Sequence, residues 1–137
     1  MRTLFIIPLV LLSLMSFPSW GLSMDDLVIR AGLYFKKFTT TPFTGEIEGL
    51  DQGKFKDGKK EGSWEYYFEN GQLWKKGNYK NGKKEGLWVR HLSNGQLISK
   101  GAYKNNKEDG EWVSYTIDGE VFLGLTGTFK NGVKVSE

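Results

Sequence analysis

The sequence predicts an all-β protein: an elongated antiparallel meander of repeated β-hairpins that forms a single twisted sheet. Three observations predict this fold. A glycine-led motif recurs at Gly53, Gly77, Gly101 and Gly127, which lie 24, 24 and 26 residues apart. Asn-Gly and Asp-Gly pairs separate runs that are rich in aromatic residues, and these runs are too short for amphipathic helices. Because such pairs supply the positive φ values of tight turns, each marks a reversal of the chain.

The composition limits the classes of function. The chain has 137 residues, with 18 glycines, 3 prolines, 15% aromatic residues and no cysteine. This length allows one ordinary domain. Without cysteine there is no disulfide, thiolate metal site, cysteine nucleophile or lipid-modified cysteine. The net charge of +3 is too small for a strongly cationic nucleic-acid-binding protein, so only the local placement of lysines bears on an anionic partner.

Residues 1–23 have the pattern of a secretory signal peptide. Arg2 precedes an apolar run over residues 4–15, which is shorter than the ~20 residues of a membrane-spanning helix. The small residues Gly21 and Ser23 follow that run. The pattern predicts cleavage after Ser23, with cleavage after Gly21 as one alternative and an uncleaved membrane anchor as another. We therefore expect an exported protein, periplasmic or secreted, that has no nucleic-acid partner.

Residues 24–52 are expected to form a divergent N-terminal cap. The segments 32–35 and 42–45 resemble shortened hairpins but lack the repeated motif. A repeat array needs atypical end units, because an ordinary unit at the end would leave its outward side uncovered.

Residues 53–137 contain the repeats. Units are predicted at 53–76, 77–100 and 101–126, followed by a partial unit at 127–137. Each unit contributes two strands, so successive turns alternate between the two edges of the sheet. The Asn-Gly-Gln-Leu turns then share one edge and the Gly-Lys-Lys-Glu-Gly turns the other. The third unit is longer near residues 124–126, which predicts a bulge or a longer turn.

The last strand, near residues 133–135, is predicted to leave an open edge. An open edge can accept a further strand or a second copy of the chain, although Lys134 is of a type that often blocks such pairing.

A two-residue turn at Asn70-Gly71 would fix the strand register. Counting back from it sets Trp64 opposite Gly77, where the ring would cover backbone that the glycine leaves exposed. We expect such positions to be structural. The predicted pairs are Phe68–Leu73, Tyr66–Lys75, Trp64–Gly77, Leu92–Leu97 and Trp88–Gly101, and the structural positions are Trp64, Gly77, Trp88, Gly101 and Trp112.

The same register places a second apolar row on the opposite face. A sheet that is apolar on both faces either twists until its rings cover it or offers one face to a partner. Large rigid rings give much contact area at a small entropic cost. We therefore expect this row to bind a protein partner; it sets Tyr67 against Trp74, His91 against Ile98 and Tyr115 against Phe122.

Lysines recur at one edge of the predicted sheet. One interpretation is that they only keep the turns soluble, because exposed charges contribute little to stability. The other is a weak contact with an anionic membrane surface, worth about 1 kcal/mol per lysine near the headgroups. The candidate residues are Lys59, Lys60, Lys83, Lys84 and Lys107.

The sequence contains no recognisable catalytic or metal-binding set. His91 is the only histidine, and it occupies the position that Tyr67 and Tyr115 hold in the neighbouring units. It is therefore expected to be a packed ring rather than a base. The serines lack a nucleophile-elbow motif, and the lysine-rich turns lack the spacing of a phosphate-binding loop. We expect a protein that is not an enzyme and that binds neither a metal nor a cofactor.

The motif over residues 70–88, Asn-Gly-Gln-Leu-x3-Gly-x-Tyr-Lys-Asn-Gly-Lys-Lys-Glu-Gly-x-Trp, resembles the bacterial MORN-repeat variant found in the YwqK-like antitoxins of toxin–antitoxin systems. The resemblance covers about residues 53–134, and residues 25–49 are similar to the leading segment of such proteins. It implies a row of β-hairpins that acts as an interaction scaffold, with lipid contact or self-association in the broader family and no catalytic residues. Asn106 departs from the pattern, since the other units have Gly58 and Gly82 there.

Two classes of function follow. The first is an exported, non-enzymatic module that binds a protein, either a toxin or a second copy of itself. The alternative is a peripheral membrane or envelope-associated scaffold that contacts anionic lipid through the lysine-rich turns. A platform of exposed rings that binds carbohydrate is a third interpretation.

Overall fold

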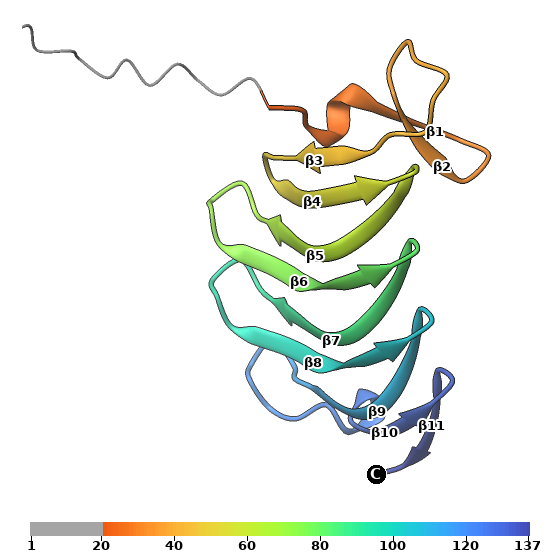
Figure 1. Cartoon of the computed structure of the whole chain (residues 1–137). Coiled ribbons are helices and arrows are strands. Elements are labelled where there is room, and N and C mark those ends of the chain that lie inside the picture. Colours follow the sequence, from red (N-terminus) through yellow and green to blue (C-terminus); the bar gives the residue numbers. More distant parts are fainter. Residues whose placement is uncertain (1–20) are drawn as a thin grey trace, which may run out of the picture.

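The computed structural model of the chain describes residues 21–137 (Figure 1). Most of the predicted signal peptide, residues 1–20, lies outside the described residues. In the described part, no helix has the length and apolar character needed to cross a membrane.

The sheet is an antiparallel meander of nine strands, β3 to β11, preceded by a two-stranded hairpin, β1–β2. Neighbouring strands are consecutive in the sequence, which confirms the predicted fold class (Figure 1). The elements are η1 (Met24–Asp26), β1 (Leu27–Arg30), β2 (Leu33–Lys36), β3 (Gly45–Ile47), β4 (Asp51–Lys56), β5 (Lys59–Tyr67), β6 (Leu73–Lys80), β7 (Lys83–His91), β8 (Leu97–Lys104), β9 (Lys107–Ser114), η2 (Leu123–Leu125), β10 (Gly127–Lys130) and β11 (Val133–Ser136).

The lysine-rich turns are two-residue reversals on one edge of the sheet. Asn81 and Gly82 both have positive φ, 50° and 78°, as this turn type requires. Asn105 and Asn106 adopt the same conformation, with φ of 49° and 71°. Asparagine tolerates this region better than most residues, so the missing glycine does not change the turn.

The Asn-Gly-Gln-Leu turns, on the other edge of the sheet, are one residue longer than predicted. The Phe68 N–H donates to the Gln72 carbonyl at 2.8 Å, and the Gly71 N–H donates to the Phe68 carbonyl at 2.9 Å. This is a three-residue loop that closes on a left-handed glycine, with a φ of 84° at Gly71. The register therefore shifts by one residue near each of these turns.

The predicted pairs Phe68–Leu73 and Leu92–Leu97 are wrong for this reason. Tyr67 pairs with Leu73, His91 pairs with Leu97, and Tyr115 forms a bridge to Val121. Trp74 is then the extra residue on β6, and beyond it the predicted register returns. The pairs Tyr66–Lys75, Trp64–Gly77 and Trp88–Gly101 are confirmed.

Strands β5, β7 and β9 each contain a bulge at a glycine and bend there. Between β4 and β5 the pairing changes from Gln52–Glu65 to Lys54–Glu61, and Gly62 lies within this irregularity with a φ of 71°. The same irregularity recurs between β6 and β7 and between β8 and β9. Figure 1 shows the resulting curvature of the strands.

The N-terminal segment covers the first strands of the sheet. The Tyr34 ring on β2 lies 4.7 Å from the Phe55 ring on β4, and the Tyr34 N–H donates to the Gly58 carbonyl at 2.8 Å. The segment 42–45 is not a hairpin as predicted, because Pro42 bridges to Phe35 and the chain then enters β3. β3 and β4 belong to the main sheet, so the predicted boundary between residues 52 and 53 lies inside β4.

The longer third unit contains the 3₁₀ helix η2 in its connection to β10. The added length thus forms a longer connection, one of the two predicted outcomes. Beyond it, β10 pairs with β9 and β11 closes the array.

Candidate functional site

One face of the sheet carries a row of interlocking rings, which we call the tryptophan face. Trp64, Trp88 and Trp112 occupy equivalent positions in successive units, with Tyr79 and Tyr103 between them. Each tyrosine meets its two tryptophan neighbours edge to face, with ring centroids 5.0 to 6.2 Å apart. Such contacts add to the stability that burial of the rings provides.

Each tryptophan is held by the strand before it. A Cβ atom at Gly77 would overlap the indole of Trp88, so the ring lies directly on the backbone there. The indole Nε1 of Trp88 donates to the Asn78 carbonyl at 3.1 Å. The pairs Trp64–Lys54 and Trp112–Ala102 repeat this bond at 3.2 and 2.9 Å. These contacts fit the structural role that the sequence predicts for the tryptophans and glycines. The predicted covering is wrong, because Trp64 pairs with Gly77 in register but its ring lies on Gly53, and the ring on Gly77 is Trp88.

The position one pleat beyond each tryptophan differs between the units. In the first unit Tyr66 stacks on Trp64, with centroids 5.8 Å apart and planes at 28°, and Trp64 is 0% exposed. Arg90 and Ser114 hold the equivalent positions in the next two units. Neither supplies a ring, and hollows lie beside Trp88 and Trp112, although Trp88 is only 4% exposed and Ser114 only 7%.

A groove occupies this open part of the tryptophan face. It consists of two hollows of about 260 and 350 Å³ that share Arg90, Ser99, Tyr103 and Trp112. Because they share these residues, the two hollows adjoin, and together they extend across the strands from β6 to β10. The remaining lining residues are Trp74, Lys75, Lys84, Trp88 and Val89 in the first hollow and Ile98, Glu108, Ser114, Tyr115, Phe122, Leu125 and Phe129 in the second.

Two lysines of the groove lie against its rings. Lys75 Nζ is 4.2 Å from the centroid of the Trp74 ring, and Lys84 Nζ is 4.9 Å from that of Trp88. Burial lowers the pKa of Lys75, and repulsion from Lys84 and Arg90 lowers it further, against an opposing effect of Asp51. Burial and repulsion from Arg90 also lower the pKa of Lys84, and here Glu108 opposes the change.

Lys60 occupies the equivalent place in the first unit, where no groove forms. Its Nζ lies 4.5 Å from the centroid of the Trp64 ring and donates to Tyr66 Oη at 2.8 Å. Burial lowers the pKa of Lys60 from 10.5 to about 8. Burial also raises the pKa of Tyr66, whose hydroxyl lies 3.1 Å from that of Tyr79.

The predicted partner-binding row does not form a single row. Its cross-strand pairs Tyr67–Trp74, His91–Ile98 and Tyr115–Phe122 are wrong, because the longer turns shift the register by one residue. Trp74, Ile98, Tyr115 and Phe122 all line the groove, whereas Tyr67 and His91 do not. The Tyr67 hydroxyl instead donates to Glu65.

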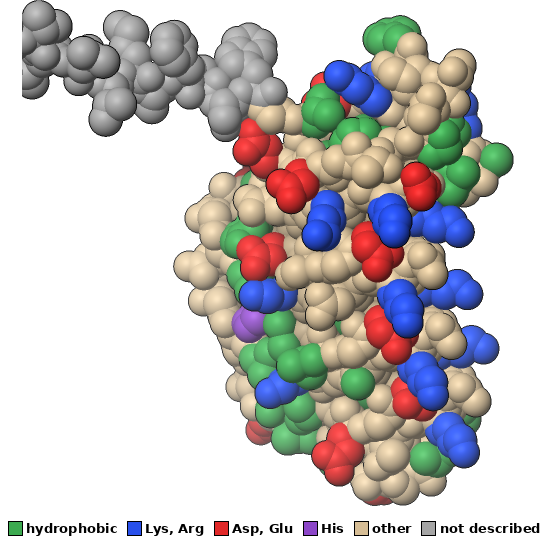
Figure 2. All heavy atoms as spheres, in the orientation of Figure 1, with side chains coloured by type: hydrophobic (Ala, Val, Ile, Leu, Met, Phe, Trp, Pro, Cys, Tyr) green, Lys and Arg blue, Asp and Glu red, His purple; other side chains and the backbone are tan. Residues whose placement is uncertain are grey.

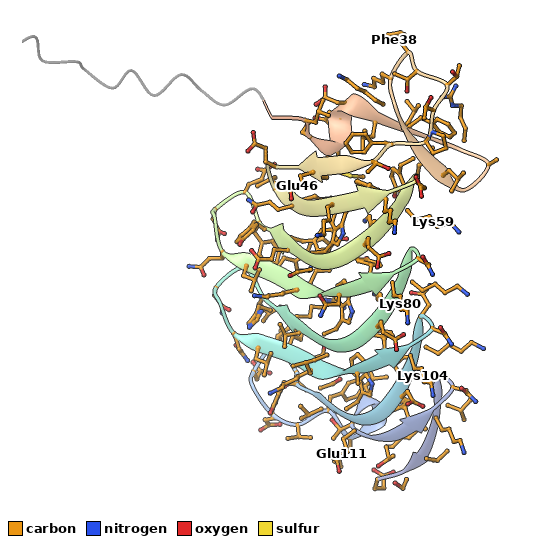
Figure 3. The ribbon with its side chains drawn as sticks, in the orientation of Figure 1. Phe38, Glu46, Lys59, Lys80, Lys104 and Glu111 are labelled. Carbon is orange, nitrogen blue, oxygen red and sulfur yellow. The ribbon has the colours of Figure 1, made fainter. Side chains whose placement is uncertain are left out.

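The five lysines predicted to contact an anionic surface do not all lie at one edge either. Lys59, Lys83 and Lys107 are exposed beside the two-residue turns, whereas Lys60 and Lys84 turn onto the tryptophan face. Figure 2 shows basic side chains along this edge with acidic ones beside them. Figure 3 labels Lys59, Lys80 and Lys104, which come from successive turns.

Some of the acidic residues at this edge bind the backbone of the next turn. Glu61 Oε2 accepts from the Asn81 N–H at 2.9 Å, and Glu85 Oε2 accepts from the Asn105 N–H at 3.1 Å. Each of these carboxylates thus links one unit to the next. The lysine edge is therefore a row of mixed charge.

Reasoning from the sequence missed Arg90 and Ser99 as groove residues. Both can be found by counting one 24-residue repeat from the correctly predicted pair Tyr66–Lys75. The informative signal is variation: a position that is a tyrosine in one unit becomes an arginine and then a serine in the next two. Such a position lies outside the repeated pattern: Tyr66 and Ser114 are buried, whereas Arg90 is exposed and can contact a ligand.

The groove brings together rings and cations but no catalytic constellation. Among residues 21–137 there is no group of three or more histidine, cysteine, aspartate or glutamate side chains that could hold a metal ion. His91 lies outside the groove lining, and its Nδ1 is buried without a hydrogen-bond partner in the described part of the chain. The arrangement is suited to holding a ligand by ring contact and by charge.

Comparison with known families identifies part of the array. A family model described as the MORN repeat variant matches residues 60–81 and 84–105. The two matches coincide with the hairpins β5–β6 and β7–β8, so the chain carries at least two repeats of this type. MORN repeats are binding units that mediate protein or membrane contacts. A search of curated proteins found no match.

Proposed function

We propose that the chain is an exported, non-enzymatic module that binds a protein partner through the groove on the tryptophan face. The observation that carries this proposal is the groove itself, where two adjoining hollows lie beside Trp88 and Trp112, at the place that the Tyr66 ring fills in the first unit. Rings held on glycine backbone are rigid, so a partner gains contact area without having to order them. Export rests on the signal-peptide pattern of residues 1–23.

The partner class follows from the MORN-variant repeats and from the shape of the groove. A recessed groove receives a protruding segment of a protein, whereas a flat bilayer would meet only its rims. A toxin that acts outside the cytoplasm is one partner of this kind, and a second copy of the chain is another.

A photo-crosslinking amino acid at Ser99 tests the proposal, because Ser99 lines both hollows. The matched control carries the same amino acid at Glu111 on β9, which lines a different hollow together with Leu87 and Lys100. In the cells that produce the chain, we expect one discrete protein adduct from position 99, none from position 111, and competition by the unmodified chain. Equal adducts from both positions, or lipid adducts alone, would contradict the proposal.

The second candidate is a scaffold that contacts anionic membrane through the lysine edge. A hollow of about 440 Å³ lies there between Lys59, Lys80, Lys83 and Lys104, all of them exposed. Three lysines near headgroups would contribute about 3 kcal/mol in all, at about 1 kcal/mol each. Sedimentation with anionic vesicles tests this candidate, using the chain with Lys59, Lys83 and Lys107 changed to glutamate.

Loss of vesicle binding in that variant, together with weak binding to neutral vesicles, would favour the membrane scaffold. Unchanged sedimentation would exclude the lysine edge. Lys60 and Lys84 are left unaltered in the test because they lie on the tryptophan face.

A further inference from the structure

The groove is chemically divided along its length. At its β6–β7 end the charged lining residues are Lys75, Lys84 and Arg90, all basic. At its β9–β10 end, apolar side chains such as Phe122 and Leu125 line the wall, and they are 47% and 54% exposed. The one acidic lining residue, Glu108, belongs to this second hollow.

Among residues 21–137 no ion pair involves the three basic residues. Within residues 21–137 the ion pairs are Lys76–Glu65 and Lys134–Glu137, and neither involves the groove. Lys75 Nζ lies 4.3 Å from the centroid of the Tyr66 ring, and Lys84 Nζ lies 4.7 Å from that of Tyr103, so both ammonium groups are held on rings rather than on carboxylates. Lys75 and Arg90 are also directly opposite each other across β6 and β7. Like charges at such positions destabilise one another, and an incoming anion would relieve that repulsion.

The length of the groove indicates an extended ligand. It crosses from β6 to β10, and adjacent strands lie about 4.8 Å apart, which gives a span of about 19 Å. An extended polypeptide covers this distance with about six residues at about 3.3 Å each. A free carboxylate or phosphate ion would occupy only one end.

We propose that the groove binds an extended segment of a partner protein that carries acidic side chains at one end and bulky apolar side chains at the other. The acidic end lies over Lys75, Lys84 and Arg90, and the apolar end lies against Phe122, Leu125 and Ile98. This inference rests on the proposed protein-binding function and adds the chemistry and the direction of the bound segment.

Two fluorescent peptides of equal length test the proposal against the purified chain. The first, Gly-Glu-Glu-Ser-Phe-Leu-Gly, has the expected pattern, and the second replaces both glutamates with lysine. We expect the first to bind at least about 10-fold more tightly, equivalent to ~1.4 kcal/mol. Its affinity should fall as salt is raised, since part of the attraction is between exposed charges.

Arg90→Gln is the first test variant, because Arg90 is exposed and its replacement leaves the rings in place. Lys84→Gln is the second, and Lys100→Gln, on the other face, is the control. We expect each groove variant to weaken the acidic peptide about 10-fold and the control to leave it unchanged. In NMR spectra the indole N–H signals of Trp88 and Trp112 should shift on titration with the acidic peptide.

Equal affinity for the two peptides, no effect of Arg90→Gln, or no shift of the indole signals would each overturn the acidic-segment proposal. Binding of phosphatidylglycerol vesicles that depends on Arg90, without peptide binding, would also overturn it and indicate a lipid headgroup. The photo-crosslinking experiment at Ser99 distinguishes the protein-binding function from the acidic-segment proposal. A protein adduct with no preference for acidic peptides would leave the protein-binding function in place and refute only the chemistry of the segment.

Discussion

Trp88 lies on Gly77 of the neighbouring strand, in the space that a Cβ atom would need. The ring is only 4% exposed. The same relationship links Trp64 to Gly53 and Trp112 to Gly101. The sheet thus builds its core from rings laid on its own backbone.

Gly77→Ala should therefore destabilise the fold. The added methyl group must displace either the Trp88 ring or β6, and overpacking of this kind typically costs about 1–3 kcal/mol. Urea denaturation measures the loss. Gly124→Ala is the control, because the nearest atoms to its Cβ would be ring atoms of Phe122 at 3.4 Å. Equal stability of the two variants would show that Trp88 does not depend on the close approach.

Stability should decrease along the array from the N-terminal to the C-terminal end. Trp64 is 0% exposed beneath Tyr66 and close to the β1–β2 hairpin, whereas Trp112 is only half-buried and β11 pairs with a single strand, β10, in the described sheet. We expect backbone amides of β5 to exchange with solvent on the order of 100-fold more slowly than those of β10, a difference of ~2.8 kcal/mol. Hydrogen exchange followed by NMR resolves individual strands. Uniform protection would indicate a single cooperative unit without fraying.

The free energy of unfolding should rise with pH between about pH 8 and pH 10. Burial lowers the pKa of Lys60 from 10.5 to about 8, so over this range the unfolded chain retains a proton that the folded chain has released. The unfolded state binds more protons, and stability therefore increases with pH. Above the usual tyrosine pKa of 10.0 the sign reverses, because burial raises the pKa of Tyr66 and only the unfolded chain loses that proton.

Urea midpoints measured from pH 7 to pH 11 give this profile. Lys60→Met keeps the apolar stem and should flatten the rise, whereas Lys100→Met on the other face should preserve it. A rise that survives in Lys60→Met would assign the effect to other groups, with Lys75 and Lys84 as the first candidates.

A chain that begins at Leu22 should be more stable than one that begins at Met24. The Leu22 carbonyl accepts from the Glu48 N–H at 2.8 Å, the Leu22 side chain packs against the core, and the Ser23 N–H donates to Asp26 Oδ2 at 2.8 Å. Cleavage after Gly21 keeps these contacts, and cleavage after Ser23 removes them. A loss of about 1 kcal/mol lowers the melting temperature of a domain of this size by about 4 °C.

Thermal unfolding of the two forms, followed by circular dichroism, measures the difference. Ser23→Ala in the longer form is the control, since it keeps the backbone donor and removes only the longer Ser23 Oγ contact with Asp26 at 3.3 Å. Identical melting temperatures would show that residues 22 and 23 contribute nothing to the fold. N-terminal sequencing of the exported protein identifies which form exists.

The meander and the glycine–tryptophan pairs could be predicted because they depend on the period. Both the 24-residue repeat and the Asn-Gly turns are visible in the sequence, and the pairing of Trp64 with Gly77 follows by counting. The longer turn at Asn70-Gly71 could not be identified in this way. Asn-Gly is compatible with a two-residue turn, as at Asn81-Gly82, and with a three-residue loop in which only the glycine is left-handed.

This single ambiguity explains most of what was wrong about the site. A shift of one residue moves side chains to the other face, which is why Tyr67 does not line the groove although Trp74 does. The predicted lysines are split between two surfaces because successive side chains of a strand point to opposite faces, and Lys59 and Lys60 are adjacent. The groove itself lies where Arg90 and Ser114 replace the Tyr66 ring, a variation that is visible in the sequence once the register is known.

The two ends of the array are unlike, and this gives the molecule a direction of growth. The β1–β2 hairpin covers one end, whereas within the array a whole unit could be duplicated between residues 100 and 101, inside β8, because the copy would keep the period and the turns on both edges. Each added pair of strands would lengthen the groove by about 10 Å. The number of units would then set the length of ligand that fits. A gene with more or fewer repeats would encode a protein that binds longer or shorter molecules while its core stays the same.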